Sequence, residues 1–246
     1  MIESWTDLRH VDLRGIRLAY RALGPRSGVP AVLLHGLASS SETWRAFAVE
    51  LAGAGRRVVV PDLRGPGASA HARRYALADF EADTEGLLDY LDVRRVDLVG
   101  HSLGGRVASM VAERRPDSVR RLVLEEVRPP SRQGAGRISY PRPTLTDLTR
   151  NLRLLSRLRS FDRSMAGPLL RQFRVPDPGW WTALPAITAK TLLIQGGRSG
   201  YVPLDCVREI NSLIADSSLV TIDSGHRVHS TCAREFRALA LPFLTD

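Results

Sequence analysis

The sequence is poor in lysine and cysteine: Lys190 is its only lysine, and Cys206 and Cys232 are its only cysteines. Two cysteines do not provide the disulfide framework of a small extracellular domain. Long apolar runs are also missing, since none approaches the roughly 18 residues of a membrane-spanning helix. Residues 1–7 are acidic and lack the apolar core of a signal peptide. These absences predict a cytoplasmic protein without a membrane span.

Aromatic residues are sparse as well, at 6% of the chain, although the net charge is +9. Arginine supplies almost all of the positive charge, and a GC-rich gene explains that bias without any partner. A basic surface attracts anionic molecules, but the sequence has no recognised nucleic-acid-binding motif. We therefore expect no nucleic-acid partner, and an anionic or carrier-bound substrate is kept as an alternative.

The chain does contain a regular alternation of short apolar runs and stretches of helical periodicity. Strands are expected over residues 8–13, 16–21, 30–34, 57–62, 96–99, 119–124, 191–195 and 218–222, and helices over 44–51, 77–91, 103–114, 204–214 and 232–244. Strands that alternate with helices favour a doubly wound, mostly parallel α/β sheet that is covered on both faces. A chain of 246 residues suits one such domain with a modest insertion.

The alternation stops between residues 128 and 185, where prolines and arginines are frequent and no strand is evident. Two helices are expected there, over 145–158 and 165–173. We therefore predict that residues 1–127 and 186–246 form the core. The segment between them is expected to be a short, mainly helical cap rather than a separate domain with its own core.

The most informative motif is Gly100-His101-Ser102-Leu103-Gly104, which follows an apolar run and precedes a helical pattern. In this context Gly-x-Ser-x-Gly is typical of a nucleophile elbow. The glycines let strand and helix approach closely around a strained turn, and the start of the helix favours developing negative charge. The alternative is a glycine-rich turn whose serine only caps the helix. We predict that Ser102 is a nucleophile.

Other candidate residues also follow expected strands. His35-Gly36, Glu126 and His226 each lie within four residues of the end of one. Active residues of parallel sheets gather at the carboxyl ends of the strands. We therefore expect these residues to meet Ser102 at one edge of the sheet.

The order of these motifs resembles that of the α/β-hydrolase superfamily. His35-Gly36-Leu37 resembles its oxyanion loop, residues 62–69 resemble its Asp-x-Arg-Gly-x-Gly-x-Ser loop, and residues 223–226 resemble its catalytic-histidine loop. The resemblance covers nearly the whole chain outside residues 128–185, and that insertion is similar to the cap of many members. It implies the α/β-hydrolase fold. The serine at position 102 separates this chain from the dehalogenases and epoxide hydrolases of that fold, whose nucleophile at this place is aspartate.

One position departs from the family pattern. In many relatives an aspartate follows the seventh strand, but Ser199 occupies that place here. Some relatives carry the acid after the sixth strand, where this chain has Glu125 and Glu126. Alternation along the strand directs these two side chains to opposite faces. We predict Glu126 as the acid, Glu125 as the second choice and Asp205 as a distant third; the alternative is that both glutamates end a strand in solvent.

The resemblance implies a role for each catalytic residue. Ser102 attacks a carbonyl carbon, His226 takes and later returns its proton, and Glu126 fixes the tautomer of the histidine. The backbone N–H groups of Leu37 and Leu103 are expected to bind the oxyanion.

Four further residues are expected near this site or close to it in the chain. His35, Gly36 and His101 are predicted around the substrate pocket, where His35 braces the oxyanion loop by hydrogen bonding and His101 either lines the pocket or packs beside the elbow. His229 is expected to pack or cap rather than to react. No group of residues has the spacing of a metal site, and no Gly-x-Gly-x-x-Gly follows the first parallel strand. We therefore expect neither a metal nor a cofactor.

Three classes of function compete. The first is hydrolysis of an ester, a thioester or a related acyl bond through an acyl-enzyme. The second uses the same site for elimination, cyclisation or carbon–carbon cleavage. The third is a non-catalytic binder on the same scaffold, against which the presence of both Ser102 and His226 argues. We predict the first.

The expected cap is rich in arginine and has few acidic residues. Arg150, Arg153 and Arg157 are spaced so that they share one helical face. A solvated face is the ordinary explanation of such charges. The alternative is that they attract a carboxylated, phosphorylated or carrier-bound substrate.

Overall fold

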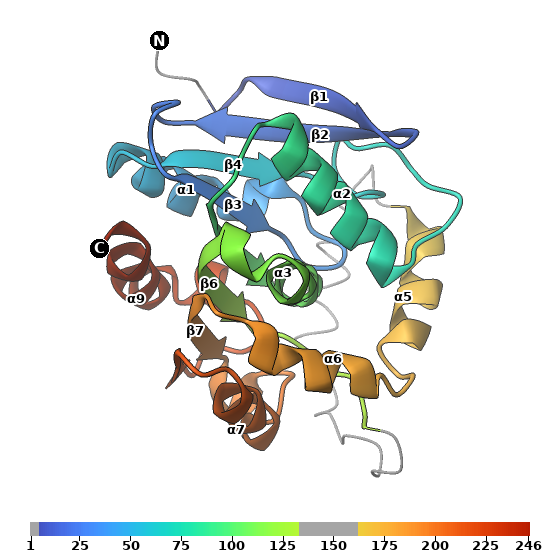
Figure 1. Cartoon of the computed structure of the whole chain (residues 1–246), viewed down its shortest axis with the longest axis vertical. Helices are drawn as coiled ribbons and strands as arrows, with labels where there is room; N and C mark the ends of the chain where they lie inside the picture. The colour runs from blue at the N-terminus through green and yellow to red at the C-terminus, as the bar shows by residue number, and fades with distance from the viewer. Residues whose placement is uncertain (1–4, 133–161) are drawn as a thin grey trace.

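A computed structural model of the chain describes residues 5–132 and 162–246. Its centre is an eight-stranded sheet with the order β1-β2-β4-β3-β5-β6-β7-β8 (Figure 1). An antiparallel hairpin, β1 (Leu8–Leu13) and β2 (Ile16–Leu23), forms one edge. The parallel strands are β3 (Pro30–Leu34), β4 (Arg57–Pro61), β5 (Val96–His101), β6 (Val119–Glu125), β7 (Lys190–Gln195) and β8 (Ser217–Thr221). The predicted mostly parallel sheet is confirmed.

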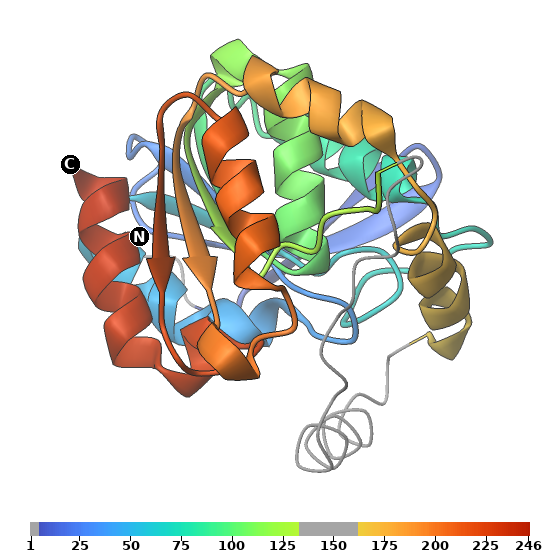
Figure 2. The ribbon, with the colours of Figure 1, turned by 90° about the horizontal axis from the view of Figure 1, so that it is seen from below.

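Helices cover both faces of this sheet, and each face has its own apolar core. One core contains side chains of α1 (Arg45–Gly53) and α9 (Ala233–Thr245). The other contains side chains of α2 (Leu77–Tyr90), α3 (Leu103–Arg114) and α7 (Leu204–Leu213). Figure 2 shows α9, in dark red, and α7, in orange, on opposite sides of the strands.

The apolar runs of the central strands follow from this double cover. Within β5, Leu98 packs in the core of α3 and the next residue, Val99, packs in the core of α9. Successive side chains of a strand point to opposite faces, so a strand with two cores is apolar at nearly every position.

A buried charge cluster joins the amino ends of the parallel strands to the last helix. Asp97, on β5, is fully buried and accepts hydrogen bonds from Arg56 and Arg120. Both guanidinium groups also donate to the carbonyl oxygen of Leu244, on α9. The two arginines thereby neutralise the buried carboxylate and hold α9 against this edge of the sheet.

The helices within and after the insertion differ in part from the expected pattern. α5 (Ala166–Gln172) lies inside the expected helix 165–173. The expected helix 145–158 and its arginines lie outside the described residues. Two short helices were not expected, α6 (Pro178–Ala183), which packs on α3, and α8 (Val228–Thr231). The division into core and cap stays a prediction.

Along the described part of the chain, no helix has the length and apolar character needed to cross a membrane. Cys206 and Cys232 are both free thiols.

Candidate active site

Ser102 lies on a sharp turn between β5 and α3. Its backbone has φ 52° and ψ −110°, a strained conformation for a residue with a side chain. A Cβ atom on Gly104 would lie 2.2 Å from the carbonyl oxygen of Leu34, so only glycine allows α3 to approach β3 this closely. The amide N–H of Ser102 donates to the carbonyl of Glu125, 2.9 Å away. The strained strand–turn–helix that the motif predicts is present.

The carboxylate of Glu126 is fully buried and contacts three groups. Oε1 accepts a hydrogen bond from the N–H of Gly196 at 2.7 Å, and Oε2 accepts one from the N–H of Tyr201 at 2.8 Å. Oε2 also lies 3.1 Å from Nδ1 of His226. A Cβ atom on Gly200 would lie 2.7 Å from Oε1, so the loop after β7 leaves room for this carboxylate only because position 200 is glycine.

The carboxylate of Glu126 lies in the loop after β7, which has Ser199 where many relatives carry an aspartate. Ser199 lies within the loop that contains Gly196 and Tyr201, and the side chain of Glu126 reaches into the same loop from β6. Backbone N–H groups stabilise a carboxylate regardless of which strand carries it. The carboxylate of Glu126 and its backbone donors therefore meet although they come from different strands.

The ring of His226 is held on two sides and is 21% exposed. Nδ1 faces Glu126. The ring of Tyr201 stacks on the imidazole ring of His226, with the ring centroids 4.4 Å apart and the planes at 19°. Since a nitrogen that faces a carboxylate carries the proton, Nε2 is the free acceptor of the neutral imidazole. In the described residues no hydrogen bond joins Ser102 Oγ to His226, and such contacts often tighten only when substrate binds.

The segment after β3 packs against the turn that carries Ser102. A Cβ atom on Gly36 would lie 3.4 Å from the Cβ atom of Ser102. The buried ring of His35 accepts a hydrogen bond from the N–H of Leu63 at 2.9 Å, and its Nδ1 contacts the carbonyl of Gly36 at 2.8 Å. Burial lowers the pKa of His35, so its ring stays neutral and keeps both contacts. His35 thus fixes the conformation of this segment.

Two backbone donors are available beside Ser102. Leu37 follows Gly36, and Leu103 is the first residue of α3. Among the hydrogen bonds of residues 5–132 and 162–246, none uses the N–H of either leucine. Both groups can therefore bind an oxygen of a substrate.

Glu125 and Glu126 contact different histidines. Glu125 is fully buried, and its Oε2 lies 2.7 Å from Nδ1 of His229. The alternative in which both glutamates end a strand in solvent is wrong, because both side chains are buried. Asp205, the third choice for the acid, is exposed and pairs with Arg208 at 2.9 Å.

Sequence reasoning missed the part that two residues play in this region. Tyr201 was not singled out, although its ring and its N–H both help to define the site. His229 was expected only to pack or cap, but it forms a buried pair with Glu125. Its spacing of three residues from His226 is the one feature that hinted at a shared location.

Sequence comparison decides the family. The α/β-hydrolase fold family matches residues 30–143. The 2-hydroxy-6-oxo-2,4-heptadienoate hydrolase of Pseudomonas putida is 31% identical over 89% of this chain and 90% of its own length. The sn-1-specific diacylglycerol lipase of Mus musculus is 28% identical over 96% of this chain and 87% of its own. The chain belongs to the α/β-hydrolase family.

The solved structures agree with this assignment. A hydrolase from Pseudomonas aeruginosa superposes on this α/β hydrolase with a TM-score of 0.81 and 25% identity, over 98% of this chain and 99% of that one. The fold, and the place of the chain among hydrolases, are therefore as the motifs predicted.

One group of side chains in the described part of this α/β hydrolase has the composition of a metal site. Ligand atoms of His101, Glu125 and His229 lie within 4.8 Å of one another. The carboxylate oxygens of Glu125 already accept hydrogen bonds from His229, and Nε2 of His101 contacts the carbonyl of His226. These contacts form a hydrogen-bond network, and we assign no metal to it.

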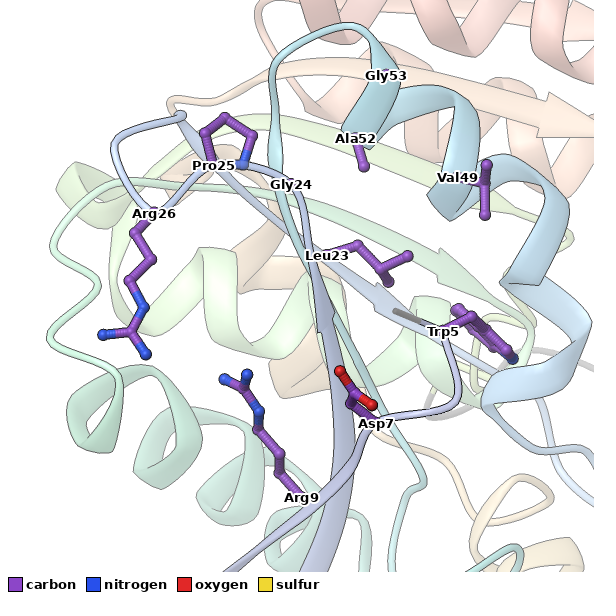
Figure 3. Close-up of a pocket in the computed structure, with 10 residues that line it drawn as sticks. All are labelled: Trp5, Asp7, Arg9, Leu23, Gly24, Pro25, Arg26, Val49, Ala52 and Gly53. Carbon is purple, nitrogen blue, oxygen red and sulfur yellow. The ribbon is translucent and has the colours of Figure 1, made fainter. Parts of the chain in front are cut away.

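A cavity of about 1160 Å³ lies away from Ser102. Figure 3 shows Trp5, Leu23 and Val49 on its apolar side, and the side chains of Arg9 and Arg26 at its other end. Leu23 pairs with Val58 at the start of β4, so the cavity lies at the amino edge of the parallel strands. Ser102 lies at the opposite edge, and this cavity is therefore not the candidate substrate site.

Proposed function

We propose that this α/β hydrolase is a serine hydrolase that cleaves an ester, a thioester or a related acyl bond. The contact between His226 Nδ1 and Glu126 Oε2, 3.1 Å apart, carries the proposal together with the strained turn at Ser102. A hydroxyl, an imidazole and a carboxylate at such positions form an activated nucleophile with its base and the group that orients the base. The similarity to a diacylglycerol lipase supports ester chemistry.

Each residue has one role in the proposed mechanism. Ser102 Oγ attacks the carbonyl carbon while Nε2 of His226 removes the hydroxyl proton. His226 then gives that proton to the leaving group, and the acyl-enzyme forms. In the second half water attacks the acyl carbon while His226 takes its proton, the bond between the acyl carbon and Ser102 Oγ breaks, and His226 returns the proton to Ser102 as the acid leaves. Glu126 keeps the proton on Nδ1, so that Nε2 is ready to accept one.

The negative charge of the tetrahedral intermediate needs donors that are already in place. We assign this role to the backbone N–H groups of Leu37 and Leu103, because neither group is used elsewhere in the described structure. Loss of one such donor typically costs about 3 kcal/mol of transition-state stabilisation. His35 and Gly36 belong to the segment that carries Leu37, and we propose that this segment forms part of the wall of the substrate pocket. The buried ring of His101 contacts the carbonyl group of His226 instead.

A second candidate function has support from one relative. The Pseudomonas putida hydrolase is named for a substrate, 2-hydroxy-6-oxo-2,4-heptadienoate, that contains a ketone and a carboxylate but no ester. Hydrolysis of such a compound breaks a carbon–carbon bond. The same hydroxyl, base and oxyanion donors serve that reaction, so the substrate rather than the site distinguishes the two functions.

The nature of the substrate is a further proposal. We expect a small acyl compound, in free or carrier-bound form, with an anionic group because the chain carries a net charge of +9. The two free cysteines fit a reducing compartment such as the cytoplasm.

The test compares the wild type with Ser102→Ala on p-nitrophenyl esters of graded acyl length and on 2-hydroxy-6-oxo-2,4-heptadienoate. We expect the wild type to react with a fluorophosphonate probe, and Ser102→Ala to lose both labelling and about 10⁴-fold or more of the turnover. Ser212→Ala, on the exposed side of α7, is the control and should keep full activity. Labelling that survives in Ser102→Ala would refute the proposal, and turnover of the dienoate alone would favour the second function.

A further inference from the structure

The main chain that carries His226 is fixed by buried side chains from the ends of β5 and β6 and from α8. These side chains are His101, Glu125 and His229, which we call the histidine clamp. None of the three contacts the ring nitrogens of His226. They hold instead its carbonyl group and the helical turn that follows it.

His101 binds the carbonyl group of His226. Nε2 of His101 lies 2.7 Å from that oxygen, and because a carbonyl only accepts, Nε2 carries the proton. The ring of His101 is buried, with its centroid 4.8 Å from that of His226. Burial, followed by the nearby charges of His226 and His229, holds the pKa of His101 well below its ordinary value. The ring therefore stays neutral, and its hydrogen bond persists.

Glu125 holds the turn that begins two residues after His226. Its Oε1 accepts the backbone N–H of His229 at 3.0 Å, and its Oε2 lies 2.7 Å from Nδ1 of the same residue. Nε2 of His229 lies 2.6 Å from Thr43 Oγ1, and Trp44 stacks on the ring with centroids 4.2 Å apart. The side chain of His229 is thus held on three sides and is buried.

Two of the clamp residues are neighbours of the proposed catalytic residues in the sheet, and this position links the clamp to catalysis. His101 precedes Ser102, and Glu125 precedes Glu126, so each clamp residue on the sheet is next to a residue of the proposed triad. The N–H of Ser102 also donates to the carbonyl of Glu125. The ends of β5 and β6 therefore supply the nucleophile, the acid and both anchors of the base. Small errors in the position of a catalytic group cost a large part of the rate.

We propose that His101, Glu125 and His229 are positioning residues that hold the main chain of His226 in register with Ser102. The proposal rests on the proposed function for its kinetic effect, but the geometry of His226 can be measured without turnover. Removal of the clamp lowers kcat because it displaces the base, and leaves KM nearly unchanged because the buried clamp side chains contact the chain around His226.

The first experiment compares His101→Leu with His101→Gln. Leucine removes the donor, whereas the amide nitrogen of glutamine occupies nearly the place of Nε2 and donates to the same carbonyl. We expect His101→Leu to lower kcat about tenfold with KM within about twofold, and His101→Gln to recover most of the loss. Thr191→Val removes a buried hydrogen bond in β7 away from the site and serves as the control for lost stability.

The second experiment removes the buried pair as a unit. The double variant Glu125→Leu/His229→Leu leaves no lone charge in the core, so it avoids the large penalty of a single deletion. We again expect about a tenfold loss in kcat. The Nδ1–H proton resonance of His226, followed by NMR in histidine labelled with nitrogen-15, should shift and broaden in this variant and in His101→Leu.

The outcomes separate this inference from the proposed function. Wild-type kcat and an unchanged His226 resonance in folded His101→Leu and in the double variant would overturn the inference. Turnover that survives Ser102→Ala would overturn the proposed function, while the NMR comparison would still report on the clamp. Equal losses in Thr191→Val would show that reduced stability alone explains the kinetic effect, and would likewise overturn the inference.

Discussion

Two adjacent glutamates at the end of β6 have different partners because the chain turns between them. Glu125 is the last residue of the strand, and Glu126 has a positive φ of 49°. This conformation is uncommon for a residue with a side chain, and here it directs the carboxylate into the loop after β7. Strain of this kind is found mainly where function requires it.

Substitution of each of the two glutamates is expected to have a different effect on kcat. Glu126→Gln should keep the fold but lower kcat about 10⁴-fold, because an amide neither orients the His226 tautomer nor stabilises its charged form. Glu125→Gln should cost far less, since the amide oxygen still accepts the N–H of His229. Steady-state kinetics on one ester, with circular dichroism for folding, compare the two variants. A larger loss in Glu125→Gln would assign the acid to the other glutamate.

At the same scale the sequence predicts side chains better than it predicts their partners. Ser102 and His226 are predicted from motifs, and Glu126 is predicted from the place after the sixth strand where some relatives carry the acid. The donors to Glu126 are backbone N–H groups of the loop after β7, which any residue can supply. The stacking of Tyr201 depends on how two loops approach each other in space. Neither feature leaves a pattern in the sequence.

Among the secondary-structure elements, α3 has two structural roles. Its first residues form the nucleophile turn, and its outer face carries α6. Arg106 pairs with Asp177 at 2.6 Å and lies 4.2 Å from the ring centroid of Trp180. Glu113, farther along α3, has a buried carboxylate oxygen with no hydrogen-bond partner in the described residues.

This carboxyl makes stability depend on pH. Burial raises the pKa of Glu113 from 4.5 to about 8. The folded protein thus binds the proton more tightly than the unfolded chain, so the free energy of unfolding falls as pH rises from 4.5 to about 8 and then levels off. Glu113→Gln should match the wild type near pH 4 and be clearly more stable at pH 9, because each tenfold difference in proton affinity corresponds to about 1.4 kcal/mol. Urea unfolding at both pH values measures this; equal stability at pH 9 would contradict it.

The long elements were predictable, and the short helices were not. The eight strands and the helices α2, α3, α7 and α9 follow from apolar runs and helical periodicity. α6 and α8 span six and four residues, too few to show a period, and each depends on tertiary contacts. Trp180 of α6 is held by its hydrogen bond to Ser109, and His229 of α8 by Glu125.

Over the whole molecule, the buried charges of the amino edge couple the sheet to the last helix. Asp97→Ala would leave the guanidinium groups of Arg56 and Arg120 without their carboxylate. We expect a loss of about 3–5 kcal/mol in the free energy of unfolding. Urea denaturation gives this value, and kcat below the transition should be normal because the cluster lies opposite Ser102. A variant as stable as the wild type would show that solvent replaces the lost partner.

Net charge predicts a second property of the whole molecule. With +9 overall, the protein should attract an anionic ester, and this attraction weakens as the Debye length falls from about 10 Å at 0.1 M salt to about 3 Å at 1 M. We expect kcat/KM for an anionic ester to fall with added salt, while that for a neutral ester of the same acyl group stays nearly constant. Parallel responses would leave the arginines as ordinary surface charge.

The active site forms late in folding because of the parallel pairing of β5 with β6, β6 with β7, and β7 with β8. Glu126 and His226 are 100 residues apart in the chain and meet only when all of these strands are in register. Contacts between such distant segments form slowly, because a long loop must close before they stabilise anything. During refolding from urea, helical signal should therefore return before fluorophosphonate labelling does, and reactivity of Ser102 would mark the last stage of folding.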